Sequence, residues 1–378
     1  MSRELRVLEI LRTVPQSPGG IENFVFRAVE GMDRTGLRID FLSAYPCMNR
    51  AYVNRAERTG GKVYTLSFRH GMRKPAMFAR MVRFLRNRPY DVIHVHSGWI
   101  MELTAWAAAA RIAGTGRVIL HSHCAGADEN PYAQSVKAAL CRMPAARFAD
   151  ECCACSRFSA EYTYGRKAAN RIRVIRDGIP AERFRFNPAV REALRSRYFI
   201  PETGLVAGYV ANFYPVKNHM FLLDVFGKIL EKQPGARLLL VGEGEEKDRV
   251  LAAAEQRGIA DRVIFTGTTD RVQDYLQMMD VFVFPSRNEG LGMAAVEAQA
   301  AGLPVVASEG VRQEAAVTDN IVFLPLSDGA EAWADTVLRM AERVRTDRTE
   351  QVRACGYDIR ESAGILREMY RASPGEQR

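Results

Sequence analysis

The 378-residue sequence contains no run of about 20 uninterrupted apolar residues, and residues 1–11 alternate between charged and apolar types. A membrane-spanning helix needs such a run, and a secretory signal needs a continuous apolar core, so the sequence predicts neither. Cysteine is also scarce, with seven residues that lie mostly within apolar runs. Because a chain of this length does not need disulfides for stability, we expect reduced thiols and a cytoplasmic location.

Two nucleotide-binding motifs are missing as well. The sequence has no Gly-x-x-x-x-Gly-Lys-Ser/Thr and no Gly-x-Gly-x-x-Gly, which argues against a P-loop NTPase and a dinucleotide-dependent dehydrogenase. The 47% hydrophobic content is too high for a disordered chain. A packed protein of about two domains is therefore expected.

Charge is divided unevenly along the chain. Residues 1–200 hold 33 Lys and Arg against 17 Asp and Glu, a net charge of +16. Residues 201–378 hold 20 against 27, a net charge of −7. A basic half joined to an acidic half indicates two domains that meet different partners.

The densest basic stretch, residues 68–88, mixes Arg and Lys with large apolar residues at helical spacing. This pattern favours peripheral contact with an anionic membrane. An ordinary helix with one face in the core and a solvated basic face is equally compatible with it. No recognisable nucleic-acid-binding module is present, so no nucleic-acid partner is expected.

Short β-rich runs alternate with segments of helical length and period. In the first half these runs are 6–11, 37–42, 62–66, 91–96, 117–121, 151–155 and 172–175. After a break at 201–204 they are 205–210, 237–241, 262–265, 281–284, 304–307 and 321–324. Near-continuous apolar strands with helical crossovers predict an α/β protein with two doubly wound parallel sheets. Ligands are then expected outside the carboxyl ends of the strands.

The most informative strand end lies within residues 281–297. An apolar strand ends at Pro285, a polar loop carries Glu289 and Gly292, and a helix carries Glu297. Backbone N–H groups at such a helix start favour an anion, notably phosphate. The two carboxylates, eight residues apart, could accept hydrogen bonds from two sets of sugar hydroxyls. Spacing alone leaves open that Glu289 is a solvated loop residue and Glu297 a surface charge.

The segment Ser286-x-x-Glu289-Gly290-x-Gly292-x-x-x-x-Glu297-Ala298 resembles the Glu-x7-Glu signature of retaining GT-B glycosyltransferases. These are enzymes of glycosyltransferase group 1, family 4, of the type that builds bacterial capsular polysaccharide and exopolysaccharide. Residues 211–219, 241–244 and 263–267 fit the same family, as do 18–22, 121–123, 154–156 and 174–179 in the first half. The resemblance extends from about residue 5 to residue 310 and is specific for the family, but not for the sugar.

The resemblance implies the GT-B fold, with two Rossmann-like domains and a cleft between them. Residues 1–175 would form an acceptor-binding domain, onto which a C-terminal helix within 358–378 packs back, and residues 176–357 a nucleotide-sugar-binding domain. It implies catalytic roles for His123, Glu289 and Lys217. It implies donor binding by Gly19, Gly20, Asn212, Lys217, Gly242, Glu289, Gly290, Leu291, Gly292, Met293 and Glu297.

Within that set the resemblance distinguishes roles. Lys217 would bind the donor pyrophosphate, Glu297 the ribose hydroxyls and Glu289 the donor sugar, whereas His123 would lie near the reacting carbon. Asn212 stands where many relatives have Arg, so one phosphate contact is weaker here or supplied elsewhere. Asp177 stands where Asn is usual, a departure that the sequence does not explain.

A metal or other cofactor is not expected. No Asp-x-Asp pair occurs, so the metal–diphosphate grip of the other main glycosyltransferase fold is missing. The pairs His94-x-His96 and His121-x-His123 could suggest a metal centre. Each pair lies at a strand end, however, and the resemblance accounts for His123. Cys152-x-x-Cys155 resembles half of a zinc or redox motif, but residues three apart in a strand point to opposite faces, so buried strand cysteines are predicted.

The function implied by the resemblance is that of a retaining hexosyltransferase. It would move a hexosyl group from a nucleotide-diphosphate sugar, with UDP favoured over GDP, to a lipid-linked saccharide or another hydroxyl acceptor. Its expected place is the cytoplasm, peripheral at the inner membrane face, in cell-surface polysaccharide synthesis. Two alternatives stay open: a nucleotide-sugar epimerase of the same fold, and a non-catalytic sugar-nucleotide-binding protein, which the Asn212 departure motivates.

Overall fold

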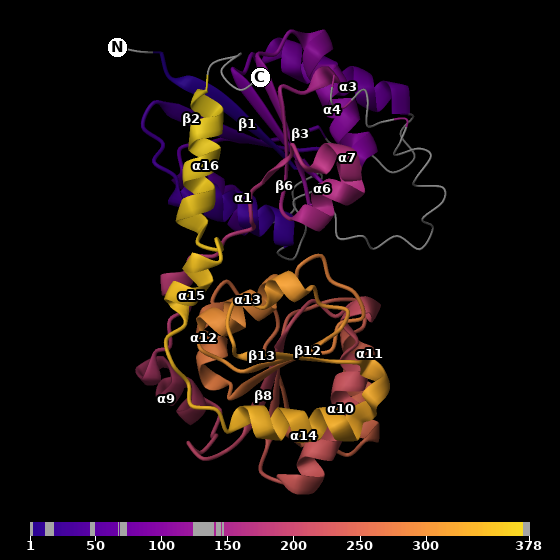
Figure 1. Cartoon of the computed structure of the whole chain (residues 1–378), viewed down its shortest axis with the longest axis vertical. Coiled ribbons are helices and arrows are strands. Elements are labelled where there is room, and N and C mark those ends of the chain that lie inside the picture. Colours follow the sequence, from indigo (N-terminus) through magenta and orange to yellow (C-terminus); the bar gives the residue numbers. More distant parts are fainter. Residues whose placement is uncertain are drawn as a thin grey trace. The chain divides into compact units, whose positions relative to one another are not determined.

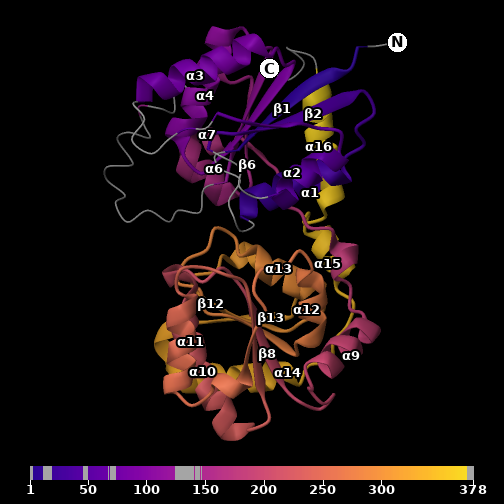
Figure 2. The same ribbon diagram turned by 180° about the vertical axis from the view of Figure 1, so that it is seen from behind.

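The computed structural model describes residues 3–11, 19–45, 50–66, 68, 74–123, 140, 145 and 147–372. They form two compact units, unit 1 (Met1–Ile179 with Tyr357–Arg378) and unit 2 (Pro180–Gly356). In each unit, helices cover both faces of a sheet (Figures 1 and 2). The sequence predicted boundaries after residues 175 and 357. The structure places them after residues 179 and 356.

Unit 1 is built on a 7-stranded sheet of order β3-β2-β1-β4-β5-β6-β7, in which every pairing is parallel. Its strands are β1 (Leu5–Leu11), β2 (Leu37–Ser43), β3 (Val63–Thr65), β4 (Val92–Ser97), β5 (Arg117–Ser122), β6 (Glu151–Ala154) and β7 (Arg173–Val174). Its helices include α1 (Gly20–Gly31), α2 (Arg50–Arg58), α3 (Lys74–Asn87), α4 (Ile100–Ala113), α6 (Arg157–Tyr164), α7 (Arg166–Ala169) and α16 (Ile359–Arg371).

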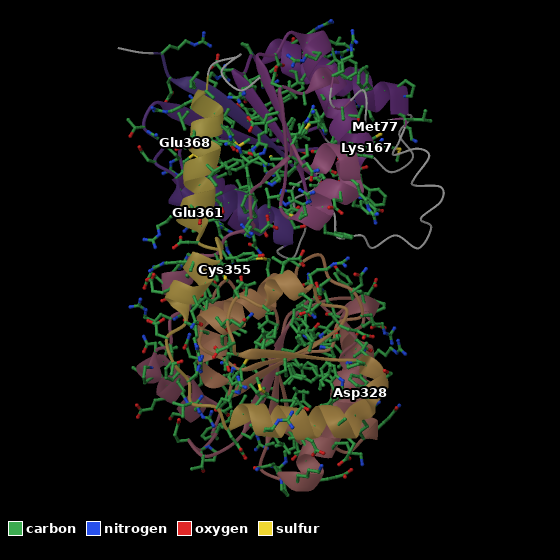
Figure 3. The ribbon with its side chains drawn as sticks, viewed as in Figure 1. Met77, Lys167, Asp328, Cys355, Glu361 and Glu368 are labelled. Atoms are coloured by element: carbon green, nitrogen blue, oxygen red, sulfur yellow. The ribbon has the colours of Figure 1, made fainter. Side chains whose placement is uncertain are left out.

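Side chains along the central strands point alternately to the two faces of the sheet, so unit 1 has two apolar cores, one on each face. On β1, Val7 and Leu11 pack on the face covered by α1 and α16, whereas Leu8 and Ile10 pack on the face covered by α3 and α4. Helix α16 turns its apolar side to α1, and its Glu361 and Glu368, labelled in Figure 3, are exposed. A strand buried on both faces is rich in apolar residues, and β1 was located by its apolar residues although it contains Arg6 and Glu9.

The chain leaves unit 1 and returns to it at one crossing point. Ile179 pairs with Asp358 in a parallel bridge, and its N–H donates to the Tyr357 carbonyl at 2.8 Å. A Cβ at Gly178 would lie 2.7 Å from the backbone of Ile359. Real Cβ atoms do not approach backbone that closely, so only glycine lets the two segments pack here.

Unit 2 is built on a 6-stranded parallel sheet of order β10-β9-β8-β11-β12-β13. Its strands are β8 (Val206–Val210), β9 (Arg237–Val241), β10 (Val263–Phe265), β11 (Val281–Phe284), β12 (Val305–Ser308) and β13 (Ile321–Leu324). Its helices are α8 (Ala181–Phe184), α9 (Pro188–Arg197), α10 (His219–Lys232), α11 (Lys247–Gln256), α12 (Val272–Met278), α13 (Met293–Ala300), α14 (Gly329–Ala341) and α15 (Thr349–Ala354).

The strand predictions from the sequence are confirmed in both units, because each predicted strand is present and its bounds agree to within one residue. In each sheet the strand order reverses direction between two neighbours, β1 and β4 in unit 1 and β8 and β11 in unit 2. Ligands of open parallel sheets bind at the carboxyl ends of the strands at such a switch point.

The basic stretch at 68–88 can be compared with the structure over its helix, α3; residues 69–73 lie outside the described residues. The large apolar side chains Met81, Val82, Phe84 and Leu85 are buried in the core under α3. Arg80, Arg83 and Arg86 are exposed. The structure thus shows a helix with a solvated basic face, the alternative that the sequence left open. Among the described helices, none has the length and apolar character needed to cross a membrane.

Candidate functional site

Lys217 and Glu289 meet at the carboxyl edge of the unit 2 sheet. Lys217 ends the short 3₁₀ helix η1 (Pro215–Lys217) that follows β8, and Glu289 lies in the loop after β11. The Lys217 Nζ atom lies 2.7 and 2.8 Å from the two carboxylate oxygens of Glu289. Because β8 and β11 are neighbours at the switch point, the fold joins side chains 72 residues apart in the sequence. This ion pair therefore lies where the topology predicts a ligand.

Hydrogen bonds fix the two loops that carry this pair. The Tyr209 hydroxyl donates to the Lys217 carbonyl at 3.1 Å and lies 2.8 Å from the Ser286 hydroxyl. Burial and the nearby Glu289 raise the pKa of Tyr209 well above its ordinary value, so its hydroxyl stays protonated. Asn218 adopts a left-handed conformation with φ 58° and donates from its side chain to the Pro285 carbonyl at 3.2 Å. The lysine is thus held on a rigid loop.

Helix α13 begins directly beside this pair in the sequence. Gly292, which precedes its first residue, has φ 94°, and a Cβ there would lie 2.9 Å from Val311 and 3.0 Å from Phe284. Glycine is therefore required for the tight entry into the helix. The N–H groups of the first turn, which starts at Met293, carry partial positive charge, and such a helix start suits an anion.

Both carboxylates of the Glu-x7-Glu segment are buried. Glu289 is 9% exposed in its loop, and Glu297, one helical turn after Met293 on α13, is 8% exposed. This burial excludes the alternative in which Glu289 is a solvated loop residue and Glu297 a surface charge. Buried carboxylates are rare unless they are paired or have a function.

Asn212 and Gly242 lie in the loops after β8 and β9. Gly242 has φ 147°, and a Cβ there would lie 2.0 Å from the Ala211 carbonyl oxygen. Its N–H donates to the Gly267 carbonyl at 3.0 Å. Close packing of the two loops therefore explains this glycine. The Gly242 N–H could donate to a nucleotide sugar only if its hydrogen bond to the Gly267 carbonyl were lost. Asn212 is partly exposed in its loop.

Gly19 and Gly20 lead from β1 into α1 in unit 1, whereas Pro18 lies outside the described residues. Gly20 is the first residue of α1, and a Cβ there would meet no described atom within 4 Å. The residues that the structure describes thus give no steric reason for glycine at position 20. The sequence prediction, that a ligand approaches the backbone closely here, stays a prediction.

His123 follows β5 directly and belongs to a chain of buried polar side chains. Its Nε2 lies 3.0 Å from His96 Nδ1, and its Nδ1 lies 3.3 Å from Asp177 Oδ1. His96 Nε2 lies 2.8 Å from one Glu9 oxygen, and the Tyr370 hydroxyl donates to the other. We call the series Tyr370, Glu9, His96, His123 and Asp177 the buried polar chain; it joins α16, β1, β4 and the loops after β5 and β7.

The charge states at the centre of this chain follow from burial and from the neighbouring rings. Burial acts to raise the pKa of Glu9. The neighbouring His94 and His96 outweigh this effect and hold the pKa far below its ordinary value. Burial, with the adjacent His94, lowers the pKa of His96 to about 3. Near neutral pH, Glu9 is therefore an ionised acceptor and His96 a neutral imidazole.

The same residues form groups with the donor atoms of a metal site. Ring nitrogens of His96, His121 and His123 lie within 4.8 Å of one another. The rings of His121 and His123 are stacked, however, with centroids 4.2 Å apart and planes at 28°. Their lone pairs then run side by side instead of converging on one ion. Stacking accounts for the position of His121, and hydrogen bonds account for His96 and for His123 Nε2. The absence of a metal requirement stays a prediction.

The cysteines of β6 lie near this cluster. Cys152 and Cys153, together with Cys155 and Cys355, are free thiols among the described cysteines. Burial raises the pKa of Cys152 to about 12 and that of Cys153 well above its ordinary value. A thiol with a raised pKa is a poor nucleophile, so Cys152 and Cys153 have a packing role. The prediction of buried strand cysteines, made for Cys152 and Cys155, fits only in part, because both are half-buried and Cys155 lies one residue beyond β6.

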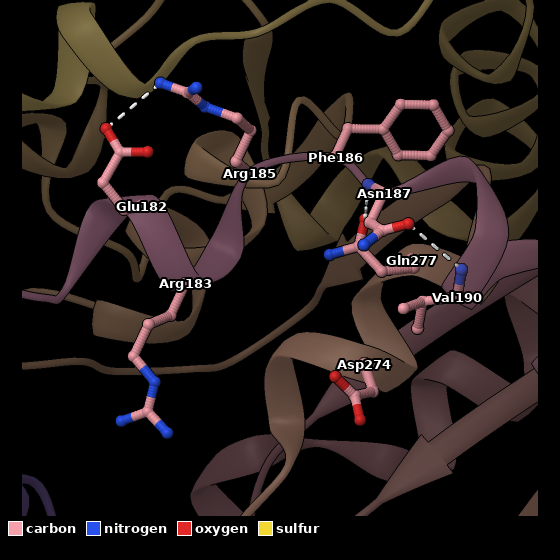
Figure 4. A pocket seen from close by; sticks show the side chains of 8 residues that line it. All are labelled: Glu182, Arg183, Arg185, Phe186, Asn187, Val190, Asp274 and Gln277. Carbon is pink, nitrogen blue, oxygen red and sulfur yellow. Dashed lines mark hydrogen bonds and ion pairs between the residues drawn. The ribbon is translucent and has the colours of Figure 1, made fainter.

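A separate pocket of about 250 Å³ lies in unit 2, next to α8, α9 and α12 (Figure 4). It is lined by Glu182, Arg183, Arg185, Phe186, Asn187, Val190, Asp274 and Gln277. Within it, Arg185 donates to Glu182 at 3.1 Å, and the Asn187 N–H donates to the Gln277 side chain at 3.1 Å. None of the site residues predicted from the sequence lines this pocket, and its polar groups are largely paired with one another.

Comparison with known families matches residues 190–351 to the glycosyl transferases of group 1 and residues 18–183 to glycosyltransferase family 4. EpsF of Bacillus subtilis (strain 168), named as a glycosyltransferase, is 30% identical over 383 residues, covering 98% of each chain. The chain belongs to the group 1, family 4 glycosyltransferases. The family resemblance predicted from the Glu-x7-Glu segment and its companions is confirmed at this level.

One further relative of this glycosyltransferase agrees with the assignment, and a solved structure agrees with the fold. A Mycobacterium tuberculosis protein named as a GDP-mannose-dependent α-(1-6)-phosphatidylinositol monomannoside mannosyltransferase is 30% identical over 321 residues, 80% of each chain. The crystal structure of Anabaena HepE in complex with UDP and glucose matches with a TM-score of 0.76 at 19% identity, covering 97% of this chain and 99% of that one. With the two parallel sheets, these matches confirm the GT-B fold.

Of the buried polar chain, only His123 was predicted as a site residue; His96 and Asp177 were noted without such a role, and Glu9 and Tyr370 were not noted at all. Glu9 is an acidic residue among the buried apolar residues of 7–11 in β1, and this signal could have identified it. Tyr370 lies 361 residues away from Glu9 in the sequence, so no local pattern connects the two.

Proposed function

We propose that this glycosyltransferase is a retaining hexosyltransferase that uses a nucleotide-diphosphate sugar, with UDP as the nucleotide, and a hydroxyl acceptor on a saccharide. The Lys217–Glu289 ion pair at the unit 2 switch point, beside the start of α13, is the observation that carries this proposal. A cation and a helix N-terminus together suit a diphosphate. Such groups also stabilise the negative charge that a departing diphosphate gains in the transition state.

The existing ion pair suggests how the donor would bind. A diphosphate carries more negative charge than one carboxylate, so it would take the ammonium of Lys217 from Glu289. Glu289 would then be free to accept hydrogen bonds from the donor sugar, and Glu297 from the ribose. Asn212 would give a neutral hydrogen bond where many relatives have Arg, and His123 would lie near the reacting carbon.

Retention of configuration is part of the proposal. No described carboxylate other than Glu289 is assigned to the donor sugar, and we assign Glu289 to hydrogen bonds with the sugar hydroxyls, not to covalent attack. Attack by the acceptor from the face that the diphosphate leaves, assisted by the departing phosphate, accounts for transfer without a covalent sugar–enzyme intermediate. Unit 2 would bind the donor and the basic unit 1 the acceptor.

A panel of nucleotide sugars tests the donor assignment. Because a ligand that binds only the folded state stabilises it by about 2.7 kcal/mol at 100 times its Kd, a UDP-sugar is expected to raise the melting temperature of this protein by several degrees. The matching GDP-sugar should shift it less, in buffer containing EDTA. A larger shift by GDP-sugars would overturn UDP, and no shift by any nucleotide sugar would overturn donor binding itself.

A second assay separates transfer from the related chemistry of an epimerase. The stabilising sugar nucleotide is incubated with the protein with and without a saccharide acceptor. Transfer requires the acceptor and gives a product with the anomeric configuration of the donor. Formation of an epimer without acceptor, or of an inverted product, contradicts the proposal.

A lipid-linked saccharide at the inner membrane face is the acceptor that we propose, with membrane contact through α3. Since the large apolar side chains of α3 are buried and Arg80, Arg83 and Arg86 are exposed, contact would be electrostatic and without insertion. We therefore expect flotation with anionic vesicles at low salt that is lost above about 0.5 M salt, where screening is short-ranged.

A charge-reversal variant tests the surface involved. Arg80→Glu/Arg83→Glu should abolish flotation, whereas Arg249→Glu, at an exposed arginine of unit 2, should not. Absence of vesicle binding at low salt would count against membrane contact. Binding that persists at high salt would show insertion, which the buried apolar face of α3 does not provide.

A further inference from the structure

Three side chains with metal-ligating atoms lie together at the carboxyl edge of the unit 1 sheet. His123 follows β5, Cys155 follows β6 and Asp177 lies in the segment after β7. These three strands are neighbours in the sheet. A ring nitrogen, the cysteine sulfur and a carboxylate oxygen of the group all lie within 4.8 Å of one another. Adjacent strand ends thus bring nitrogen, sulfur and oxygen donors into one small volume.

Two of these donor atoms have no hydrogen-bond partner within the described part of the chain. They are His123 Nδ1 and Asp177 Oδ1, and both are buried. The His123 side chain is only 2% exposed, and the two atoms lie 3.3 Å apart. Buried polar atoms are nearly always satisfied, so two that face each other without partners need an explanation, such as a bound ion. Nitrogen and oxygen ligands of a tetrahedral zinc ion lie about 3.3 Å from each other.

The buried polar chain fixes the direction of the His123 ring. His123 Nε2 lies 3.0 Å from His96 Nδ1, and His96 Nε2 lies 2.8 Å from a Glu9 oxygen. Because His96 engages Nε2, the opposite nitrogen Nδ1 is turned toward Asp177. Metal-binding histidines in general use their second ring nitrogen in this way, and the contact sets the orientation of the ring.

Backbone hydrogen bonds hold the strand ends that carry the three side chains. The His123 N–H donates to the carbonyl of the last residue of β4 at 3.1 Å, and the Cys155 N–H to that of the last residue of β5 at 3.0 Å. The Ile175 N–H, two residues before Asp177, donates to the last residue of β6 at 2.9 Å. A site on rigid strand ends needs little ordering when it binds a ligand.

We propose that His123, Cys155 and Asp177 form a zinc site, and that an ion bound there inhibits the proposed sugar transfer. Imidazole nitrogen, thiolate and carboxylate oxygen are the ligands that zinc takes, and three of them leave a fourth position open. The thiolate disfavours Mg²⁺ and Ca²⁺, which prefer oxygen ligands. One thiolate and one carboxylate also balance the charge of a divalent ion. Cys155 and Asp177 are half-buried, so an ion could reach them from solvent.

The inhibition rests on the proposed function, whereas the binding of zinc does not. His96 engages Nε2 of His123, and zinc would engage Nδ1. The ring would then have no nitrogen left for a donor sugar, near whose reacting carbon the proposed function places it. Zinc here is an inhibitor and not a cofactor, which agrees with transfer that requires no metal.

The proposal also gives a chemical meaning to the departure at position 177. An Asn there would offer a neutral oxygen to a cation, whereas Asp offers a charged one. The two side chains have nearly the same shape. Asp177 therefore adds the negative charge that a cation site needs without changing its geometry.

Cobalt(II), a coloured ion that takes the same ligands as zinc, tests the site without any substrate. The full-length protein is freed of metal with EDTA, transferred to buffer with a phosphine reductant and titrated with Co²⁺. We expect one equivalent to bind, with the absorption of a tetrahedral cobalt ion and a thiolate-to-cobalt band. Zn²⁺ should displace it and Mg²⁺ should not.

Near-isosteric variants locate the bound ion. Cys155→Ser should remove the thiolate band, and Asp177→Asn should weaken binding by at least about tenfold. Cys355→Ser, at an exposed thiol of unit 2, should change neither. Melting temperatures measured without metal check that each variant is folded. Absence of cobalt binding to the wild type, or a thiolate band that survives Cys155→Ser, overturns the zinc site.

Zinc inhibition of transfer tests the second half of the proposal. Zinc should stop transfer by the wild type, and EDTA should restore it. Cys155→Ser should be active in EDTA and should need at least about tenfold more zinc for the same inhibition, whereas Cys355→Ser should match the wild type. Equal zinc sensitivity of Cys155→Ser and wild type overturns inhibition through this site. If the wild type transfers no sugar in EDTA, the proposed function fails, while the cobalt spectra still decide the zinc site.

Discussion

Substitution of Lys217 by Ala is expected to abolish sugar transfer, lowering kcat by about a thousandfold. The Lys217 ammonium is the cation assigned to the donor diphosphate, and its rigid loop keeps it at the unit 2 switch point. Without it, the leaving group loses its charge-matched partner. Steady-state kinetics with the donor identified in the panel measure the loss of kcat. Calorimetry measures the loss of donor affinity.

The fold should tolerate this change. The Lys217 side chain is 23% exposed, so its removal leaves no cavity in the core, and the melting temperature should change by only a few degrees. Lys217→Arg keeps the charge and should retain part of the activity. Lys228→Ala, at a half-exposed lysine on α10, should behave as wild type. Full activity in Lys217→Ala would refute the role assigned to this residue.

The second large effect is a loss of stability in acid, which buried histidines cause in both units. Burial and His94 lower the pKa of His96 from 6.5 to about 3, and burial with Lys217 lowers that of His219 to about 3. Burial lowers the pKa of His121 as well. The unfolded chain binds protons at these residues below pH 6.5 while the folded chain does not. Their stabilising contribution is complete above pH 6.5 and is lost as the pH falls toward 3.

Each such proton lowers the free energy of unfolding by about 1.4 kcal/mol per pH unit. Unit 1 holds His96 and His121, so its stability should fall by about 3 kcal/mol per pH unit between pH 6 and 4, about twice the slope of unit 2. Hydrogen exchange of β4 and β5, compared with β11 and β12, measures the two slopes separately. His121→Phe should reduce the slope of unit 1 only. Equal, shallow slopes in both units would contradict neutral burial of these rings.

Much of the fold could be predicted because local patterns carry it. Apolar runs located each strand to within one residue, since strands buried on both faces are continuous in hydrophobicity. The closeness of Lys217 and Glu289 follows from parallel strands whose carboxyl ends share one edge. The family resemblance supplied the identity of these two residues. Their ion pair in the absence of donor was not predicted, because spacing says nothing of side-chain direction.

What could not be predicted depends on contacts between distant segments. Tyr370 donates to Glu9 across 361 residues, and no periodicity connects the two. Asp177 was noted as a departure, but its place 3.3 Å from His123 is revealed only by the folded arrangement. Gly178 belongs to a family segment, yet its steric reason is the returning chain at Ile359.

The crossing point at Gly178 has a consequence for the order of events during biosynthesis. Unit 2 is interposed between β7 and α16 of unit 1, so it leaves the ribosome complete while unit 1 still lacks its last helix. Until α16 emerges, Glu9 has no Tyr370 hydroxyl, and the core that α1 shares with α16 lacks the apolar side chains of that helix. The segment translated second is therefore able to fold first, whereas one sheet face of the segment translated first stays partly uncovered until the final helix packs on it.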